Sequence, residues 1–244
     1  KIYFASDFHL GVPTHAESLE REKKIISWLD EIKEDAKSIY LLGDIFDFWF
    51  EYKAVVPKGF VRLLGKLAEL SDNGTDIVLI KGNHDLWMHD YLPKEVGVQI
   101  IEDKTILSEN GKKIFLAHGD GLGPGDFGYK MIKKIFTNKM CRWLFTRLHP
   151  NFGLGIAHFW SKRSRIANNK NPEQFLGEEK EWLVSYCQKK QKENPVDYYI
   201  FGHRHLPLEI EIDTKAKYIN LGDWIHHNSY AVFDGENLIL EYLN

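Results

Sequence analysis

Five short apolar runs, each followed by a cluster of polar residues, constrain the fold of this chain more than any other feature. The runs are rich in β-branched and aromatic residues, as β-strands are. In order they are IYFAS before Asp7 and His9, SIYLL before Gly43 and Asp44, DIVLIK before residues 82–85, KIFLA before His118, and YYIF before residues 202–205. We therefore expect five strands whose carboxyl ends deliver polar side chains to one place.

Amphipathic helices are expected between the first three runs. Apolar residues recur at helical spacing over 17–37, and again over 60–70 before the stop signal Asn73-Gly74. The order strand, helix, strand, helix, strand favours an α/β sheet covered by helices. From Lys215 onward, short apolar runs alternate with Gly-Asp and Asp-Gly turns, which predicts antiparallel strands at the end.

Length and composition limit the classes of protein to consider. With 244 residues, 43% of them hydrophobic, the chain has enough apolar mass for one large domain. Cys141 and Cys187 lie far apart without a C-x-x-C motif, so we expect two free thiols. The longest stretch without charged residues, 148–161, is too short for a membrane-spanning helix, which needs about 20 apolar residues. The first residues lack the pattern of a secretory signal, so a cytosolic chain is expected.

Charge is distributed unevenly along the chain. The formal net charge is −3, yet residues 129–172 contain ten Lys or Arg and no Asp or Glu, interleaved with apolar residues at helical spacing. One interpretation is an ordinary helical lobe with a solvated basic face. The other is a surface that receives a lipid with a phosphate headgroup and contacts an anionic membrane. Nucleic acid would use the same cations, but the overall negative charge argues against it.

Seven side chains at the strand ends have the chemistry of a metal centre. Two divalent cations need roughly eight to ten ligand atoms, and a mixture of carboxylate, imidazole and amide oxygen without thiolate suits Mn²⁺, Fe²⁺ or Zn²⁺. We expect two ions, with Mn²⁺ as first choice. The candidate ligands are Asp7, His9, Asp44, Asn83, His118, His203 and His205.

Other polar residues near these motifs are expected to be structural. Asp85 and Asp120 are predicted to hold turns by accepting backbone N–H bonds. Six further histidines match no motif position and are expected to be ordinary loop or surface residues: His15, His89, His149, His158, His226 and His227.

The ordered motifs Asp-x-His, Gly-Asp-x-x-Asp, Gly-Asn-His-Asp, His-Gly-Asp and Gly-His-x-His resemble the calcineurin-like metallophosphoesterase superfamily over essentially the whole chain. The resemblance implies an α/β (α+β) fold, a two-sheet αββα sandwich with a helical cap insertion. Residues 1–244 would form one metallophosphoesterase domain, and the basic, hydrophobic cap would span 124–175.

The same resemblance implies a role for each motif residue. Asp7, His9 and His205 would hold the first metal ion, Asn83, His118 and His203 the second, and Asp44 would bridge the two. His84 would be catalytic, oriented by Asp47, and would donate to the phosphoryl oxygens or to the leaving group.

A closer resemblance concerns the substrate. The strings HGDGLGPGDFGY at 118–129 and GDIFDFW at 43–49 are similar to the UDP-2,3-diacylglucosamine pyrophosphatases of lipid A synthesis. This implies hydrolysis to UMP and 2,3-diacylglucosamine 1-phosphate by attack at the phosphorus that bears uridine, on the cytoplasmic face of the Gram-negative inner membrane. The substrate-binding residues implied are Asn83, Asp126, Tyr129, Ser161, Arg163 and Arg165.

Two alternatives remain open at this stage. Typical members of the closer family have Arg directly after the Gly-Asn pair, where this chain has His84, so a generic phosphodiesterase acting on nucleotides or nucleic acid ends is the second reading. Such an enzyme would not need an apolar lobe. The other alternative is a metal-free scaffold that binds proteins. Scaffolds of this kind lack some of the metal-ligating residues, whereas all seven candidate ligands are present in this chain.

Overall fold

Two mixed β-sheets form the body of the protein in a computed structural model that describes residues 1–123, 127–156, 159, 161, 174–214 and 216–243. The first sheet has the strand order β11-β10-β1-β2-β3-β4 and the second β5-β6-β7-β9-β8. The first comprises β1 Ile2–Ala5, β2 Ser38–Leu42, β3 Asp76–Ile80, β4 Gln99–Ile101, β10 Ser229–Phe233 and β11 Leu238–Tyr242. The second comprises β5 Lys104–Glu109, β6 Lys112–Ala117, β7 Tyr198–Phe201, β8 Pro207–Glu211 and β9 Lys217–Leu221.

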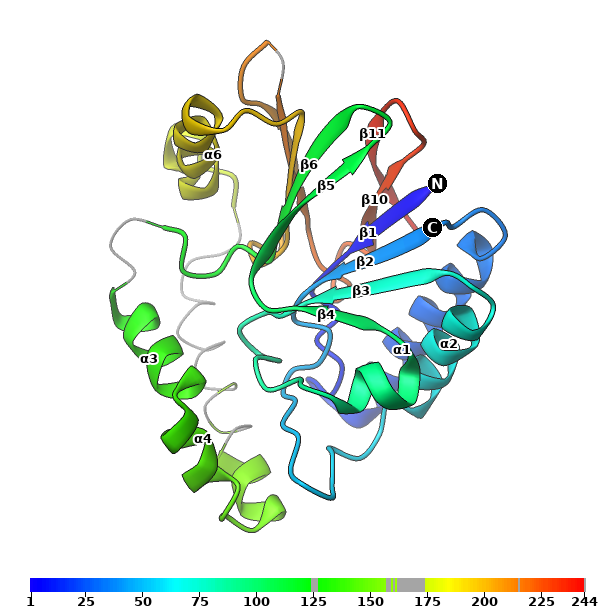
Figure 1. Cartoon of the computed structure of the whole chain (residues 1–244), viewed down its shortest axis with the longest axis vertical. Coiled ribbons are helices and arrows are strands. Elements are labelled where there is room, and N and C mark those ends of the chain that lie inside the picture. Colours follow the sequence, from blue (N-terminus) through cyan, green and yellow to red (C-terminus); the bar gives the residue numbers. More distant parts are fainter. Residues whose placement is uncertain (124–126, 157–158, 160, 162–173, 215, 244) are drawn as a thin grey trace.

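The sheets pack face to face, and helices cover both outer faces (Figure 1). Phe4 and Ile80 of the first sheet and Ile200 and Ile219 of the second belong to one buried apolar cluster between the sheets. Helices α1 (His15–Ile32) and α2 (Val61–Asp72), with the π-helical turn η1 (Leu92–Val96), cover the first sheet, and α6 (Trp182–Glu193), which follows the short 3₁₀ turn η2 (Glu178–Lys180), covers the second. The αββα sandwich expected from the motifs is confirmed.

Local sequence explains where the predicted helices begin and end. The Thr14 hydroxyl caps α1 by accepting from the Glu17 N–H. The helix ends at Ile32, five residues before the predicted end, and Ala36 packs against the core from beyond it. Helix α2 ends at Asp72, directly before the predicted stop signal Asn73-Gly74, because Gly74 adopts a φ of +92° that other residues avoid.

Parallel pairing places six strand ends at one edge of the sandwich. In the first sheet β1, β2 and β3 run parallel, and in the second β6, β7 and β9 do. The expectation of antiparallel strands at the end holds for β10 and β11 and for the pair β8 and β9. The other pairing of β9, with β7, is parallel and differs from this expectation. The chain reverses direction in β8 and again in β9, so β9 runs in the same direction as β7.

The insertion between β6 and β7 is helical, as expected, and lies to one side of the sheets (Figure 1). Its described part, residues 127–156, 159 and 161, contains α3 (Phe127–Thr137), α4 (Lys139–Phe145) and helical residues 150–156, and is called the cap below. Phe145 packs against Phe50 and Trp87 of the body, and the Trp87 indole N–H donates to the Phe136 carbonyl at 2.7 Å. The boundaries 124–175 stay a prediction.

Candidate functional site

All seven predicted ligands follow strands whose carboxyl ends meet at the shared edge. Backbone hydrogen bonds connect the segments that follow different strands. The Asp7 N–H donates to the Gly43 carbonyl, and the Gly202 N–H donates to the His118 carbonyl. Eight non-glycine residues of the described chain have positive φ, and five of these are predicted ligands: Asp7, His9, Asp44, His203 and His205. Strained backbone of this kind collects at functional sites.

The first group of donor atoms joins Asp7, His9, Asp44 and His205, whose ligand atoms all lie within 4.8 Å of one another. The Nε2 atoms of His9 and His205 are 3.0 Å apart, and His205 Nε2 lies 3.1 Å from Asp7 Oδ1. Asp44 Oδ2 lies 3.8 Å from His9 Nε2. Apart from Asp44, these are the residues that the resemblance implies for the first ion.

The second group joins Asp44, His118 and His203, again within 4.8 Å. His118 Nε2 lies 3.3 Å from Asp44 Oδ2 and 3.1 Å from the Asn83 side-chain oxygen. Asp44 is therefore common to both groups, in the place that a bridging carboxylate needs.

The donor atoms of both groups fit divalent cations. The Nδ1 atom of His118 lies 2.7 Å from the Leu42 carbonyl, which can only accept, so Nδ1 carries a proton and Nε2 is the ring atom that faces Asp44 and Asn83. These facing atoms lie 3.1 and 3.3 Å apart, close to the separation of neighbouring ligands on an ion with bonds of about 2.1 Å. In the first group, Asp7 Oδ1 is buried without a hydrogen-bond partner among the described residues.

Electrostatics give this pocket an affinity for cations. Burial opposes ionisation of Asp44, but His118 and His84 outweigh it and hold the pKa of Asp44 well below its usual value. Burial likewise disfavours charge on His118, yet the attraction of Asp44 raises the pKa of His118 to about 10. Burial and repulsion by His118 lower the pKa of His203 to about 4, which leaves its imidazole neutral at pH 7. At pH 7 the ionised carboxylate of Asp44 therefore lies beside a protonated His118 and a neutral His203, and a bound cation would take the place of the His118 Nε2 proton.

Glycines let the ligand loops approach closely. A Cβ atom on Gly82 would lie 2.2 Å from Asp44 Oδ1, and one on Gly202 would lie 2.4 Å from Asp7 Oδ2. Any side chain at either position would displace a predicted ligand, so these two glycines are required by packing.

His84 lies beside the two groups and is held through the main chain of Asp47. Its Nδ1 lies 2.9 Å from the Asp47 carbonyl oxygen and 3.8 Å from Asp47 Oδ1. The His84 N–H donates to Asp44 Oδ1, which ties the loop to the shared carboxylate. The side chain of His84 is 16% exposed, whereas that of Asp44 is 2% exposed. His84 is thus oriented towards the site and accessible from solvent.

The predicted substrate-binding residues have different outcomes. Asn83 lies in the second donor group, and Ser161 is buried with its hydroxyl donating to Asp47 Oδ2 at 2.8 Å. Tyr129 lies in α3, but its side chain is outside the described part. The remaining three, Asp126, Arg163 and Arg165, lie outside the described residues.

Sequence reasoning missed several residues that support the site. Buried Arg21 of α1 donates to the carbonyls of Phe8, His9 and Val12, which encloses the loop that carries His9. Asp120, expected only to hold a turn, accepts from Lys133 of the cap at 2.6 Å. No local pattern marks Arg21 or Lys133, because the groups they contact are distant in sequence or on the backbone.

The fold and the paired donor groups define a metallophosphoesterase. The model of the calcineurin-like phosphoesterase family matches residues 1–207, and the chain belongs to that family. Among curated proteins, the UDP-2,3-diacylglucosamine hydrolase of Porphyromonas gingivalis is 42% identical, covering 99% of this chain and 97% of the relative. The protein of the same name from Shewanella sp. (strain W3-18-1) is 27% identical, covering 100% and 97%.

One solved structure aligns along most of this chain. The predicted phosphoesterase from Streptococcus pneumoniae TIGR4 aligns with a TM-score of 0.44 and 14% identity, covering 99% of this chain and 87% of that one. Likeness at this level adds nothing to the assignment of function.

Proposed function

We propose that this chain hydrolyses the pyrophosphate bond of UDP-2,3-diacylglucosamine to UMP and 2,3-diacylglucosamine 1-phosphate. The observation that carries the proposal is the agreement between the two donor groups that share Asp44 and a 42% identical relative named for this substrate. The same relatives favour this substrate over the generic phosphodiesterase, because they match nearly the full chain, cap included.

The site would hold two divalent ions, with Mn²⁺ as first choice and Fe²⁺ or Zn²⁺ as alternatives. Asp7, His9 and His205 would bind one ion, the second set would be Asn83, His118 and His203, and Asp44 would bridge. When bound, such a pair supplies hydroxide near neutral pH and neutralises phosphoryl oxygens. The neutral state of His203 and the position of His118 Nε2, which faces Asp44 and Asn83, support ligand roles.

His84 would contact the phosphoryl oxygens or the leaving group. Because Nδ1 donates to the Asp47 carbonyl, the other ring nitrogen is left for the substrate. Asp47 would position His84 through its backbone, while its carboxylate holds the Ser161 hydroxyl of the cap. Asn83, Asp126 and Tyr129 would bind the headgroup, with Arg163 and Arg165 as further candidates, and Ser161 would act there through Asp47.

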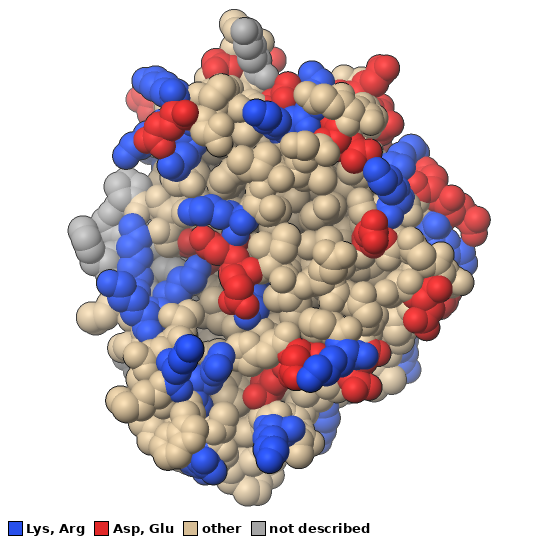
Figure 2. All heavy atoms as spheres, in the orientation of Figure 1, with Lys and Arg blue, Asp and Glu red and all other residues tan. Residues whose placement is uncertain are grey.

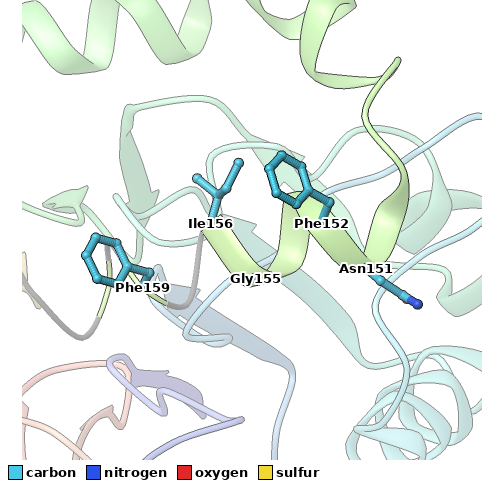
Figure 3. Close-up of a pocket in the computed structure, with 5 residues that line it drawn as sticks. All are labelled: Asn151, Phe152, Gly155, Ile156 and Phe159. Atoms are coloured by element: carbon cyan, nitrogen blue, oxygen red, sulfur yellow. The ribbon is translucent and has the colours of Figure 1, made fainter.

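The cap would receive the acyl chains. Phe152, Ile156 and Phe159 line an apolar pocket of about 320 Å³, and their side chains project away from Asn151, which lies at its rim (Figure 3). Burial of hydrocarbon in such a pocket is favourable by about 0.8 kcal/mol per methylene. A water-soluble phosphodiester would gain nothing from it.

The outer face of the cap would contact an anionic membrane, such as the cytoplasmic side of an inner membrane. Figure 2 shows Lys and Arg side chains on the surface of the cap, at left and lower left, where α3 and α4 lie. Large apolar side chains of α3 and α4 are exposed as well: Met131, Ile135, Met140, Trp143 and Leu144. No helix of the described chain is long and apolar enough to cross a membrane, so association would be peripheral.

A comparison of two substrates tests the proposal. We expect the Mn²⁺-loaded protein to cleave UDP-2,3-diacylglucosamine with a kcat/KM at least ~10²-fold above that for bis(4-nitrophenyl) phosphate, because only the lipid fills the cap. The variant Asp44→Ala should lose both activities. Faster cleavage of the soluble diester would overturn the lipid assignment and favour the generic enzyme.

A further inference from the structure

A buried carboxylate behind the first donor group has no role in the mechanism above. Asp223 follows β9, is 0% exposed, and lies in a turn whose next N–H, that of Trp224, donates to the Asp7 carbonyl at 3.2 Å. Its Oδ1 accepts from the backbone N–H groups of His226 and His227. Its Oδ2 has no hydrogen-bond partner among the described residues. A buried carboxylate oxygen without a partner calls for an explanation.

The imidazole ring of His205 lies near that oxygen. His205 Nδ1 lies 3.9 Å from Asp223 Oδ2, on the side of the ring opposite to Nε2, which faces Asp7 and His9. For Nε2 to present a lone pair to an ion, Nδ1 must carry the proton. Metal-binding histidines almost always donate this second N–H to a carboxylate, carbonyl or water, which fixes the ring and strengthens it as a ligand.

We propose that Asp223 is the positioning carboxylate of His205. Oδ2 holds the Nδ1–H tautomer and so directs the Nε2 lone pair to the first ion, while Oδ1 is anchored by the turn at His226 and His227. His227 connects Asp223 to the protein surface. Its Nδ1 lies 3.3 Å from Asp223 Oδ1, and its side chain is 31% exposed. The inference rests on the proposed metal site and adds a residue behind it.

Metal titration of Asp223→Asn tests this role. Asparagine keeps one oxygen for the turn but presents an amide N–H₂ to His205, so we expect one of the two bound Mn²⁺ ions to weaken by ~10–100-fold. The concentration of free Mn²⁺ at each step is measured by electron paramagnetic resonance. The matched control is Glu22→Gln, since Glu22 is also a buried carboxylate that accepts two backbone N–H bonds, from Arg62 and Leu63, but caps α2 instead. It should leave both affinities unchanged.

The variant His205→Ala separates this inference from the proposed site. If His205→Ala leaves both ions tightly bound, the metal-site assignment itself fails. If it weakens one ion while Asp223→Asn matches the control, Asp223 serves only the turn and the inference is wrong.

Should Asp223→Asn not fold, nuclear magnetic resonance of the Zn²⁺-loaded wild type decides. A His205 Nδ1 proton protected from solvent exchange supports the carboxylate contact, and a rapidly exchanging proton contradicts it.

Discussion

Single residues at the site adopt strained conformations that their neighbours maintain. Asp7 and His203 both have positive φ, and the Asp7 carboxylate accepts the His203 N–H at 3.0 Å. Asp44, strained as well, accepts the N–H of His84. Each such residue costs of order 1–3 kcal/mol. The candidate ligands thus support one another's backbone.

Replacement of Asp44 tests the bridge. Because Asp44 belongs to both donor groups, we expect Asp44→Ala to lose both ions and all measurable turnover. Metal content by mass spectrometry checks this, with Asp90→Ala on the surface as the control. Asp44→Asn, which keeps the acceptor for the His84 N–H, should lose activity equally. Retained activity with two bound ions would exclude a bridging role.

Replacement of His84 separates proton donation from metal binding. His84 forms a further group with His9 and Asp47 but belongs to neither of the two groups that share Asp44, so His84→Ala should lower kcat by ~10²–10⁴ while both ions stay bound. His15→Ala, at the exposed start of α1, is the control. An unchanged kcat for His84→Ala would contradict the catalytic assignment.

At the scale of elements, periodicity and motifs predicted much of what lies on one strand or helix. The strands before Asp7, Asp44 and Asn83 and the two helices between them could be predicted, because burial imposes regular spacing. Periodicity alone does not predict the division into two sheets, which was expected only from the family resemblance, since pairing of β7 with β9 depends on contacts absent from any local pattern. The contact of Ser161 with Asp47 joins residues 114 positions apart, so it could not be predicted from local sequence either.

Helix α1 stabilises the loop after β1 through Arg21. Replacement by Met would leave three buried carbonyls without a donor, so we expect Arg21→Met to lose about 2–4 kcal/mol of unfolding free energy in urea. Lys23→Met on the exposed face of the same helix should change it by less than about 0.5 kcal/mol. Equal stabilities of the two variants would show that Arg21 is dispensable.

The cap should bind membranes through its charges and its exposed apolar side chains. Association with vesicles of phosphatidylglycerol should weaken between 50 mM and 500 mM salt, because screening shortens the reach of the Lys and Arg side chains. Trp143→Ala, which removes a 54% exposed ring, should weaken binding at both salt concentrations. Co-sedimentation measures both effects. Binding insensitive to salt would argue against an electrostatic surface.

At the scale of the whole molecule, stability and metal binding are linked through the site. In the metal-free protein the pKa of His118 is raised to about 10 because Asp44 outweighs the effect of burial. The folded state therefore binds this proton more tightly than the unfolded state, whose histidines titrate near about 6.5. The stabilisation is fully present below pH 6.5 and is lost as pH rises towards 10.

Thermal denaturation at two pH values tests this linkage. We expect the metal-free protein to melt at a lower temperature at pH 9 than at pH 6.5, and the increase in melting temperature on adding Mn²⁺ to be larger at pH 9, where removal of the His118 proton costs less free energy. The variant His118→Gln should lose the part of the pH dependence that His118 causes. A metal effect independent of pH would contradict proton competition at the site.

Hydrolysis in ¹⁸O-labelled water tests the central claim most directly. The Mn²⁺-loaded protein is incubated with UDP-2,3-diacylglucosamine, and the masses of both products are determined by mass spectrometry. Attack at the phosphorus that bears uridine predicts one ¹⁸O atom in UMP and none in 2,3-diacylglucosamine 1-phosphate. Label in the lipid phosphate would place the attack at the other phosphorus, and absence of both products would contradict the proposed activity.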